Sequence, residues 1–225
     1  MYLGVGPDID DTPDREWAQA VVELGQQDGV RVAALGGDVG WVFDPDEAIN
    51  WQRAVVRTGL FDRVHVDVEV WKLDDWRARP IELGASYLRM LSCLLAVEGS
   101  LPLEADIAFH LHRVSTASGD TLETAVMRLV DAVTVLSYRN TVTGADSITD
   151  VAASALRSAA SVGIPCRLAV ETQYLGPDEV SRKQTFHGLG KNALDGALSE
   201  LDRMHVDNPT YAGMAVHDYR NWRAL

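Results

Sequence analysis

The 225-residue sequence has few cysteines and no long apolar run. The two cysteines, Cys93 and Cys166, have no metal-ligating neighbour at motif spacing, so we interpret both as core thiols in a reducing compartment. The amino end lacks a basic leader followed by an apolar core, so no signal peptide is expected. No apolar run reaches membrane-spanning length. These absences predict a soluble, cytoplasmic protein without a membrane partner.

Basic residues are also scarce, because 20 Lys and Arg stand against 33 Asp and Glu, giving a formal net charge of -13. Nucleic acids and anionic membranes bind clustered basic residues, so neither is an expected partner. Gly36-Gly37 is followed by Asp38 without a glycine-rich helix start, and no P-loop, nucleophile elbow or Cys-His signature is present. The sequence therefore predicts no cofactor. A zinc site from His110, His217 and an acid is an alternative that lacks paired local spacing, so no metal is predicted.

Strand and helix signals alternate along the chain. Helix starts are marked at Asp11-Thr12-Pro13 and Asp44-Pro45, where a capping side chain precedes a proline at the first helical position. The alternation indicates βαβ units and a parallel sheet in one domain, residues 1–225. The predicted strands cover about residues 2–6, 30–35, 61–71, 103–110, 132–138, 167–171 and 213–219, and the last long helix covers about 183–204.

The expected fold is a TIM-like (β/α) barrel of the α/β class, which normally has eight strands. Seven strands are visible, so the first βα unit is expected to be missing. Either the barrel is seven-stranded and incomplete, or a homo- or hetero-oligomeric partner covers the open amino-terminal seam, since an exposed strand edge is prone to pairing. An open doubly wound sheet is the rival fold, but its phosphate fingerprint is absent.

The segment 64–69 is the most informative part of the sequence. Valines alternate there with His65, Asp67 and Glu69, so a strand would have one apolar and one ionisable face. In a parallel barrel the valines would pack on the helices, and the acids would line the interior near the carboxyl end, where barrel enzymes keep their chemistry. A solvated strand is the alternative. Valine-rich runs flanked by helices favour the covered sheet.

Residues at the carboxyl ends of barrel strands converge, and here they combine acids, histidines and aromatic rings. Such a rim suits a sugar or another polyhydroxylated small molecule as substrate. The predicted catalytic residues are Glu69, Asp67, Tyr138 and Glu171. The predicted substrate-binding residues are Asp38, Trp41, Trp71, His110, Arg139, His217, Tyr219 and Trp222, and Asp106, Tyr174 and Asp218 belong to the same rim.

Asp67 and Glu69 repel each other when both are ionised, so one of them is expected to have a raised pKa. Glu69 lies nearer the strand end and is assigned as the general acid. Asp67 is expected one layer deeper, hydrogen-bonded to Glu69 or to the substrate, or else in an interior ion pair. His65 is expected beneath Asp67 as a buried, hydrogen-bonded partner.

Glu171 ends a later strand and could complete the two-carboxylate scheme of glycoside cleavage. Its alternative role is a salt bridge to Arg139. Tyr138 is expected to hydrogen-bond the reacting centre. Arg139 equally suits an anionic ligand. That keeps open a second hypothesis, elimination or intramolecular cyclisation of a substrate with an anionic leaving group in secondary metabolism. A third is a non-catalytic subunit of a heteromer.

Residues 62–69, Asp-Arg-Val-His-Val-Asp-Val-Glu, resemble the DxxDxDxE strand of the chitinase-like glycoside hydrolases of family 18, which are TIM barrels. Asp62, Asp67 and Glu69 match the motif, and His65 stands where the motif has an acid. The resemblance implies that Glu69 is the general acid. It also implies that Asp67 supports a substrate-assisted mechanism.

Residues 136–139 resemble the later Met-x-Tyr-Asp strand end of that family. Tyr138 matches, while Leu136 and Arg139 replace the methionine and the acid. Trp222 follows the last strand, where the family has a tryptophan at the pocket floor. The whole chain is similar to a group of uncharacterised bacterial barrel proteins, through segments such as 34–38, 65–69, 137–139, 170–172 and 217–219. The resemblance implies a glycosidase-like barrel enzyme.

Overall fold

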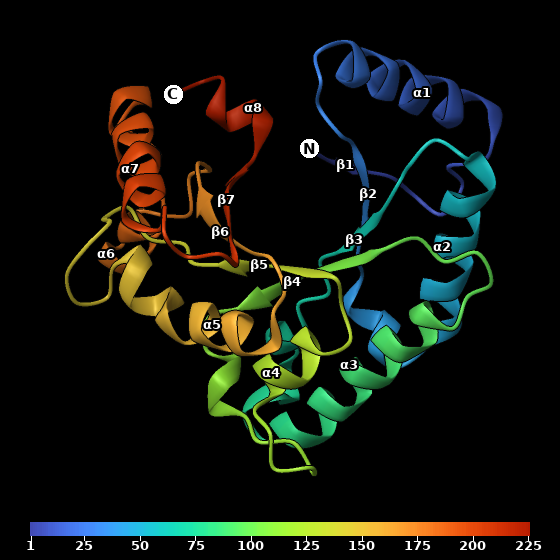
Figure 1. The fold of residues 1–225 in the computed structure, drawn as a ribbon, viewed down its shortest axis with the longest axis horizontal. Helices are drawn as coiled ribbons and strands as arrows, with labels where there is room; N and C mark the ends of the chain where they lie inside the picture. Colours follow the sequence, from blue (N-terminus) through green and yellow to red (C-terminus); the bar gives the residue numbers. More distant parts are fainter. The chain divides into compact units, whose positions relative to one another are not determined.

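The structure is a computed structural model that describes residues 1–225. Seven strands, β1 to β7, follow one another in sequence order in one sheet and alternate with helices (Figure 1). The predicted α/β class and TIM-like (β/α) barrel arrangement with seven strands are thereby confirmed. The chain forms two compact units, which comprise residues 1–106 with 114–132 and residues 107–113 with 133–225. Each unit is described by itself below.

The first unit carries the parallel pairs β1–β2, β2–β3 and β3–β4. Its helix α2 follows the sequence signals closely, since Asp44 accepts the N–H of Asp46 at 3.2 Å and Gly59 ends the helix with a φ of 64°. The elements are β1 (Tyr2–Gly4), α1 (Thr12–Gln27), β2 (Ala33–Gly36), α2 (Pro45–Thr58), β3 (Val64–Val66), α3 (Pro80–Leu95), β4 (Leu103–Ala108, which runs into the second unit) and α4 (Leu122–Met127), with 3-10 turns η1 (Val39–Val42), η2 (Val70–Lys72) and η3 (Asp74–Arg77).

The core of the first unit forms where α2 and α3 pack against each other and against the strands (Figure 1). Trp51 of α2 is buried, and its indole N–H donates to the carbonyl of Val5 at 3.0 Å. The ring of Trp51 lies so close to Gly36 that a Cβ at that position would be 2.3 Å from it. Glycine at the end of β2 therefore lets a tryptophan fill the space between strand and helix.

Strand β3 is shorter than predicted, because it ends at Val66 rather than near residue 70. All three of its residues are buried, and Val68 and Val70 beyond it are buried as well. The apolar half of the alternation therefore continues past the hydrogen-bonded strand. Glu69 lies beyond the end of β3 at Val66 and directly precedes η2.

The second unit contains the parallel pairs β5–β6 and β6–β7. The helix predicted at 183–204 begins only at Lys191, because Gly188 and Gly190 adopt left-handed φ values of 79° and 83°, and a separate short helix ends at Lys183. Strand β7 ends before Tyr219, since Asp218 caps the short helix that follows. The elements are η4 (Leu111–Arg113), β5 (Ala132–Leu136), α5 (Ile148–Val162), β6 (Cys166–Glu171), α6 (Glu179–Lys183), α7 (Lys191–Met204), β7 (Tyr211–His217) and α8 (Tyr219–Trp222).

None of the helices is both long enough and apolar enough to cross a bilayer.

Candidate active site

Asp67 directly follows β3, and the backbone at the end of β2 approaches it closely. The N–H of Asp67 donates to the carbonyl of Gly36 at 2.9 Å. At Gly37 a Cβ would lie 2.0 Å from the carbonyl oxygen of Asp67, well inside contact distance. Only a residue without a side chain at position 37 therefore allows the end of β2 to lie this close to the backbone of Asp67.

Gly37→Ala is expected to lower the free energy of unfolding by about 1–3 kcal/mol, because one of two backbone segments must move. Urea denaturation measures the change. Gly4→Ala in β1 is the matched control, since a Cβ there meets nothing within 4 Å. Equal stability of Gly37→Ala and the wild type would show that the site tolerates a shift of β2.

A buried ionic network lies beneath Asp67. The imidazole of His65 is fully buried; its Nε2 lies 3.0 Å from Oδ1 of Asp106 and its Nδ1 lies 3.5 Å from Oε2 of Glu104. Both contacts lack the angles of regular hydrogen bonds and are ion-pair contacts. The ring of Tyr2 stacks on the imidazole with centroids 4.0 Å apart. His65 is thus buried, as predicted, but its ion-pair partners are the two acids of β4.

Glu104 is held from two further directions. The hydroxyl of Tyr2 donates to Oε2 at 3.2 Å, and Nη1 of Arg63 donates to Oε1 at 2.9 Å. Burial lowers the pKa of His65, but Asp106 and Glu104 outweigh it and raise that pKa to about 9. His65 is therefore an imidazolium at neutral pH. Together with Arg63 it balances the two buried carboxylates.

Asp67 has the raised pKa of the predicted acid pair. Burial raises it most, followed by the charges of Asp106 and Glu69, while His65 and Lys72 act in the opposite direction, and the resulting pKa is about 7. Its Oδ1 is buried and has no hydrogen-bond partner. One carboxyl of the pair, Asp67, therefore keeps its proton near neutral pH, and its burial is the main cause. The assignment of Glu69 as general acid therefore rests on its position alone.

Glu69 is half-buried and forms an ion pair with Lys72, three residues further on in η2. The lysine is largely exposed, so this pair lies at the solvent end of the site. Trp71, in the same turn, is half-buried. The first unit thus brings together Asp67, Glu69, Lys72 and the Asp106–His65 ion pair.

In the second unit, Glu171 and His217 form a carboxylate–imidazole pair. Oε1 of the buried Glu171 accepts the N–H groups of Thr172 at 2.6 Å and Gln173 at 2.7 Å. Oε2 lies 2.8 Å from Nδ1 of His217, whose side chain is half exposed. The ring of Tyr138 is nearly parallel to that imidazole, with centroids 6.4 Å apart. Glu171 therefore orients His217, and the alternative salt bridge to Arg139 does not form.

The guanidinium of Arg139 is buried and forms its hydrogen bonds with the loop that follows β5. Its Nε and Nη2 donate to Oδ1 of Asp146 at 2.9 and 2.6 Å, and Nη1 donates to the carbonyl of Tyr138 at 2.7 Å. The group also lies 5.1 Å from the centroid of Phe109. Arg139 and Lys183 both pair with Asp146, and their hydrogen bonds lower its pKa. These contacts leave the anionic-ligand role of Arg139 without structural support.

The other predicted residues occupy varied environments. Asp38 caps η1 by accepting the N–H of Gly40 at 2.7 Å. Trp41 is buried against Trp51, which makes it a core residue rather than an open pocket wall. His110 is half-buried, and burial, with Arg113 and His112, lowers its pKa. Of the aromatic residues near the carboxyl terminus, Tyr219 and Trp222 are exposed on α8, where Arg223 and Lys191 lie 5.6 Å from the respective ring centroids.

Sequence reasoning missed Glu104, Tyr2 and Gly37. The sequence does contain a pattern that predicts a role for Glu104. Glu104 and Asp106 are two residues apart in β4, as His65 and Asp67 are in the neighbouring segment, so both pairs place ionisable side chains on one face. The role of Gly37 depends on the separation of two backbones, which no local pattern records.

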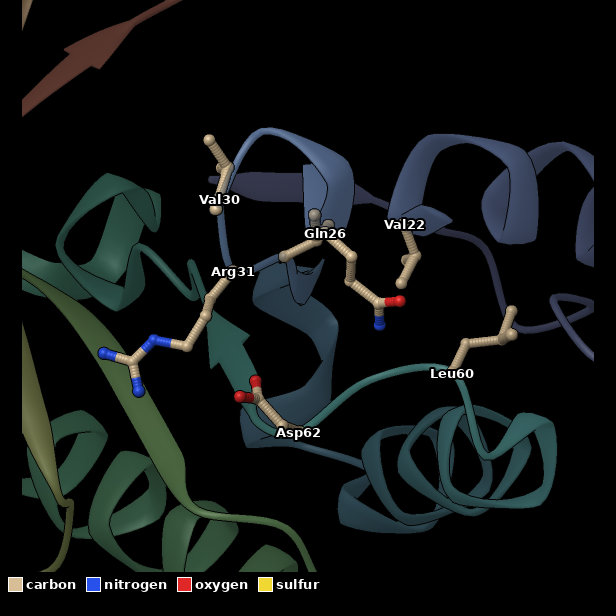
Figure 2. A pocket seen from close by; sticks show the side chains of 8 residues that line it. Val22, Gln26, Val30, Arg31, Leu60 and Asp62 are labelled. Carbon is tan, nitrogen blue, oxygen red and sulfur yellow. The ribbon is translucent and has the colours of Figure 1, made fainter. Parts of the chain in front are cut away.

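A separate cavity of about 270 Å³ lies at the opposite, amino ends of β2 and β3 (Figure 2). It is lined mainly by α1 and the segments that precede these strands, including Gln26, Arg31, Leu60 and Asp62. Asp62, the first acid of the motif-like segment, therefore lies at the end of β3 away from Asp67. Within each unit no three His, Cys, Asp or Glu side chains are arranged to hold a metal ion.

No protein-family model and no curated protein sequence matches the chain. Solved structures do match. A chitinase from Rhizomucor miehei superposes with a TM-score of 0.60 at 12% identity over 98% of this chain and 90% of that one. A chitinase from Chromobacterium violaceum gives 0.51 at 10% identity over 99% and 89%. A spore cortex-lytic enzyme from Bacillus megaterium gives 0.54 at 13% identity over 91% of this chain and 61% of its own. The predicted resemblance to chitinase-like barrels is confirmed for the fold.

Proposed function

We propose that the chain is a glycosidase-like barrel enzyme that cleaves a glycosidic bond by general acid/base chemistry. The observation that supports this best is the carboxyl pair at the end of β3, in which Asp67 keeps its proton up to about pH 7. A protonated carboxyl beside a second one is the arrangement that protonation of a leaving oxygen needs. The scaffold is one on which chitinases and a cortex-lytic enzyme are also built.

In this proposal the two carboxyls have different roles. Glu69, at the solvent end of the pair and protonated from the solvent, donates its proton to the leaving oxygen as the glycosidic C–O bond breaks. It then takes a proton from the water molecule whose oxygen bonds to the sugar carbon. Asp67 lies deeper and, in its protonated form, donates a hydrogen bond to the reacting part of the substrate. Lys72, which pairs with Glu69, steadies that side chain before the substrate arrives. Glu171 is assigned as the group that orients His217, on the evidence of their 2.8 Å contact.

Chitin fragments and spore cortex are the first substrates to test, since the matched structures are named for them. The experiment measures release of reducing ends by the wild type and by an Asp67→Asn, Glu69→Gln double variant. Release by the wild type alone supports the proposal. Failure of the folded wild type to release sugar from any of these polymers would contradict it for this substrate class.

The pH dependence provides a second test. Because Asp67 must be protonated, kcat/KM is expected to fall as pH rises through about 7, the pKa of that carboxyl. Asp67→Asn cannot lose a proton at this position, so its residual activity should lack that limb. A wild-type profile that stays flat between about pH 6 and pH 8 would rule out the proton on Asp67 as a requirement.

A further inference from the structure

Asp106 lies beside Asp67 on the neighbouring strand. The parallel register pairs His65 with Glu104 and Val66 with Ala105, so the next step sets Asp67 opposite Asp106. Side chains two residues apart in a strand share a face, and directly opposed residues on adjacent strands have Cβ atoms about 5 Å apart. Asp106 is 9% exposed, so its carboxyl is largely removed from water.

The carboxylate of Asp106 is restrained from turning away. His65 contacts it at 3.0 Å, and the ring of His65 is itself held by the stacked Tyr2 and by the contact with Glu104. The hydroxyl of Tyr87 donates to the main-chain carbonyl of Asp106 at 3.4 Å in the buried interior. His65 and Tyr87 thus contact Asp106 directly, while Tyr2 and Glu104 act on it by holding His65.

We propose that Asp106, restrained by His65, is a positioning residue that keeps the proton on Asp67. The proposal rests on the proposed function, in which the protonated form of Asp67 faces the substrate. Two adjacent carboxyls in a desolvated layer do not both ionise readily. The imidazolium of His65 contacts Asp106, not Asp67, so its positive charge faces Asp106 and the proton remains on Asp67.

The charged groups around Asp67 agree with this assignment. Asp106 from β4 and Glu69 from its own segment disfavour its ionised form, whereas His65 and Lys72 favour it. Tyr87 of α3 also faces the site, and burial, followed by the charges of Asp106 and Asp67, raises the pKa of its phenol. Among these neighbours, Asp106 has the largest effect on Asp67 after burial itself.

The test compares two variants that each remove one buried carboxylate in contact with His65. Asp106→Asn removes the charge opposite Asp67, and Glu104→Gln removes the charge on the far side of the imidazole. The measurement is the titration midpoint of Asp67, followed through its side-chain carbon by NMR without substrate and assigned with Asp67→Asn. We expect Asp106→Asn to lower the midpoint by about 1–2 pH units, and Glu104→Gln to leave it near the wild-type value.

An unchanged midpoint in Asp106→Asn, or equal shifts in both variants, would overturn the proposal, because the total charge of the network would then be responsible. A loss of stability alone would not move the midpoint. Should Asp106→Asn not fold, the wild-type titration decides: a midpoint of Asp67 near the ordinary carboxyl value refutes the assignment. The readout needs no turnover, so expected midpoints without any glycoside cleavage would reject the proposed function and leave the charge network intact.

Discussion

Glu69→Gln is expected to lower kcat/KM on a cleaved glycoside by about 10²–10⁴-fold, the usual contribution of a positioned acid/base group. The substitution keeps the size of the side chain and a hydrogen-bonding end, but it removes the acidic group that donates and accepts the proton. The half-buried residue makes its main contact with the exposed Lys72, so the fold should be unaffected. Steady-state kinetics at the optimum pH, with near-UV circular dichroism as a check of folding, measure the effect.

Glu98→Gln is the matched control for Glu69→Gln, because it makes the same chemical change at an exposed position in the segment between α3 and β4. It should retain wild-type activity. Undiminished activity of Glu69→Gln would remove Glu69 from the mechanism and leave Asp67 as the remaining acid of the pair.

His65→Leu is expected to lower the free energy of unfolding by about 3–5 kcal/mol, because it leaves Asp106 and part of the charge of Glu104 buried without a counter-ion. Urea denaturation at neutral pH measures the loss. His187→Leu, an exposed histidine, is the control and should change stability by less than about 0.5 kcal/mol. In the double variant His65→Leu, Asp106→Leu the loss should be smaller than the sum of the single losses. A purely additive result would mean that the 3.0 Å contact contributes nothing.

The same network fixes how stability depends on pH. The pKa of His65 is raised from 6.5 to about 9, so its contribution is complete below pH 6.5 and is lost as pH rises through about 9. The pKa of Asp67 is raised from 3.8 to about 7, so ionising it also costs stability as pH rises through that range. Both terms have the same sign. The difference in unfolding free energy between wild type and His65→Leu should therefore shrink between pH 6.5 and 9.

The sequence predicted the fold well where local signals are strong. Asp44-Pro45 and Gly59 mark the two ends of α2, and the valines at 64, 66 and 68 are buried as their alternation indicated. The sequence places the end of β3 too late, because alternate side chains remain buried at Val68 and Val70, beyond the last strand residue, Val66. The alternation of apolar residues indicates which side chains are buried and not which residues pair in the sheet. The prediction is therefore wrong at the carboxyl end of β3.

The sequence predicts which residues belong to the site, but it does not predict which side chains contact each other there. Asp67 and Glu69 could be chosen from one strand, yet which of them has the raised pKa depends on depth and on Asp106, which lies 39 positions away. Arg139 was expected to be available to a ligand, but its partner Asp146 lies in the following loop, where no periodic pattern applies. Trp41 was expected at a pocket wall because its depth depends on packing against Trp51, a residue of another helix.

Because the carboxyl of Asp67 is buried, the charge of a ligand decides whether its binding releases a proton from that carboxyl. An amine or another cation seated against it favours the ionised form, so its binding near neutral pH expels a proton into the solvent and tightens as the medium becomes more alkaline. An uncharged ligand that accepts the hydrogen bond of Asp67 does the reverse: it retains the proton and weakens under alkaline conditions. Mimics of the same sugar that differ only in charge therefore acquire opposite pH dependences from a single buried oxygen.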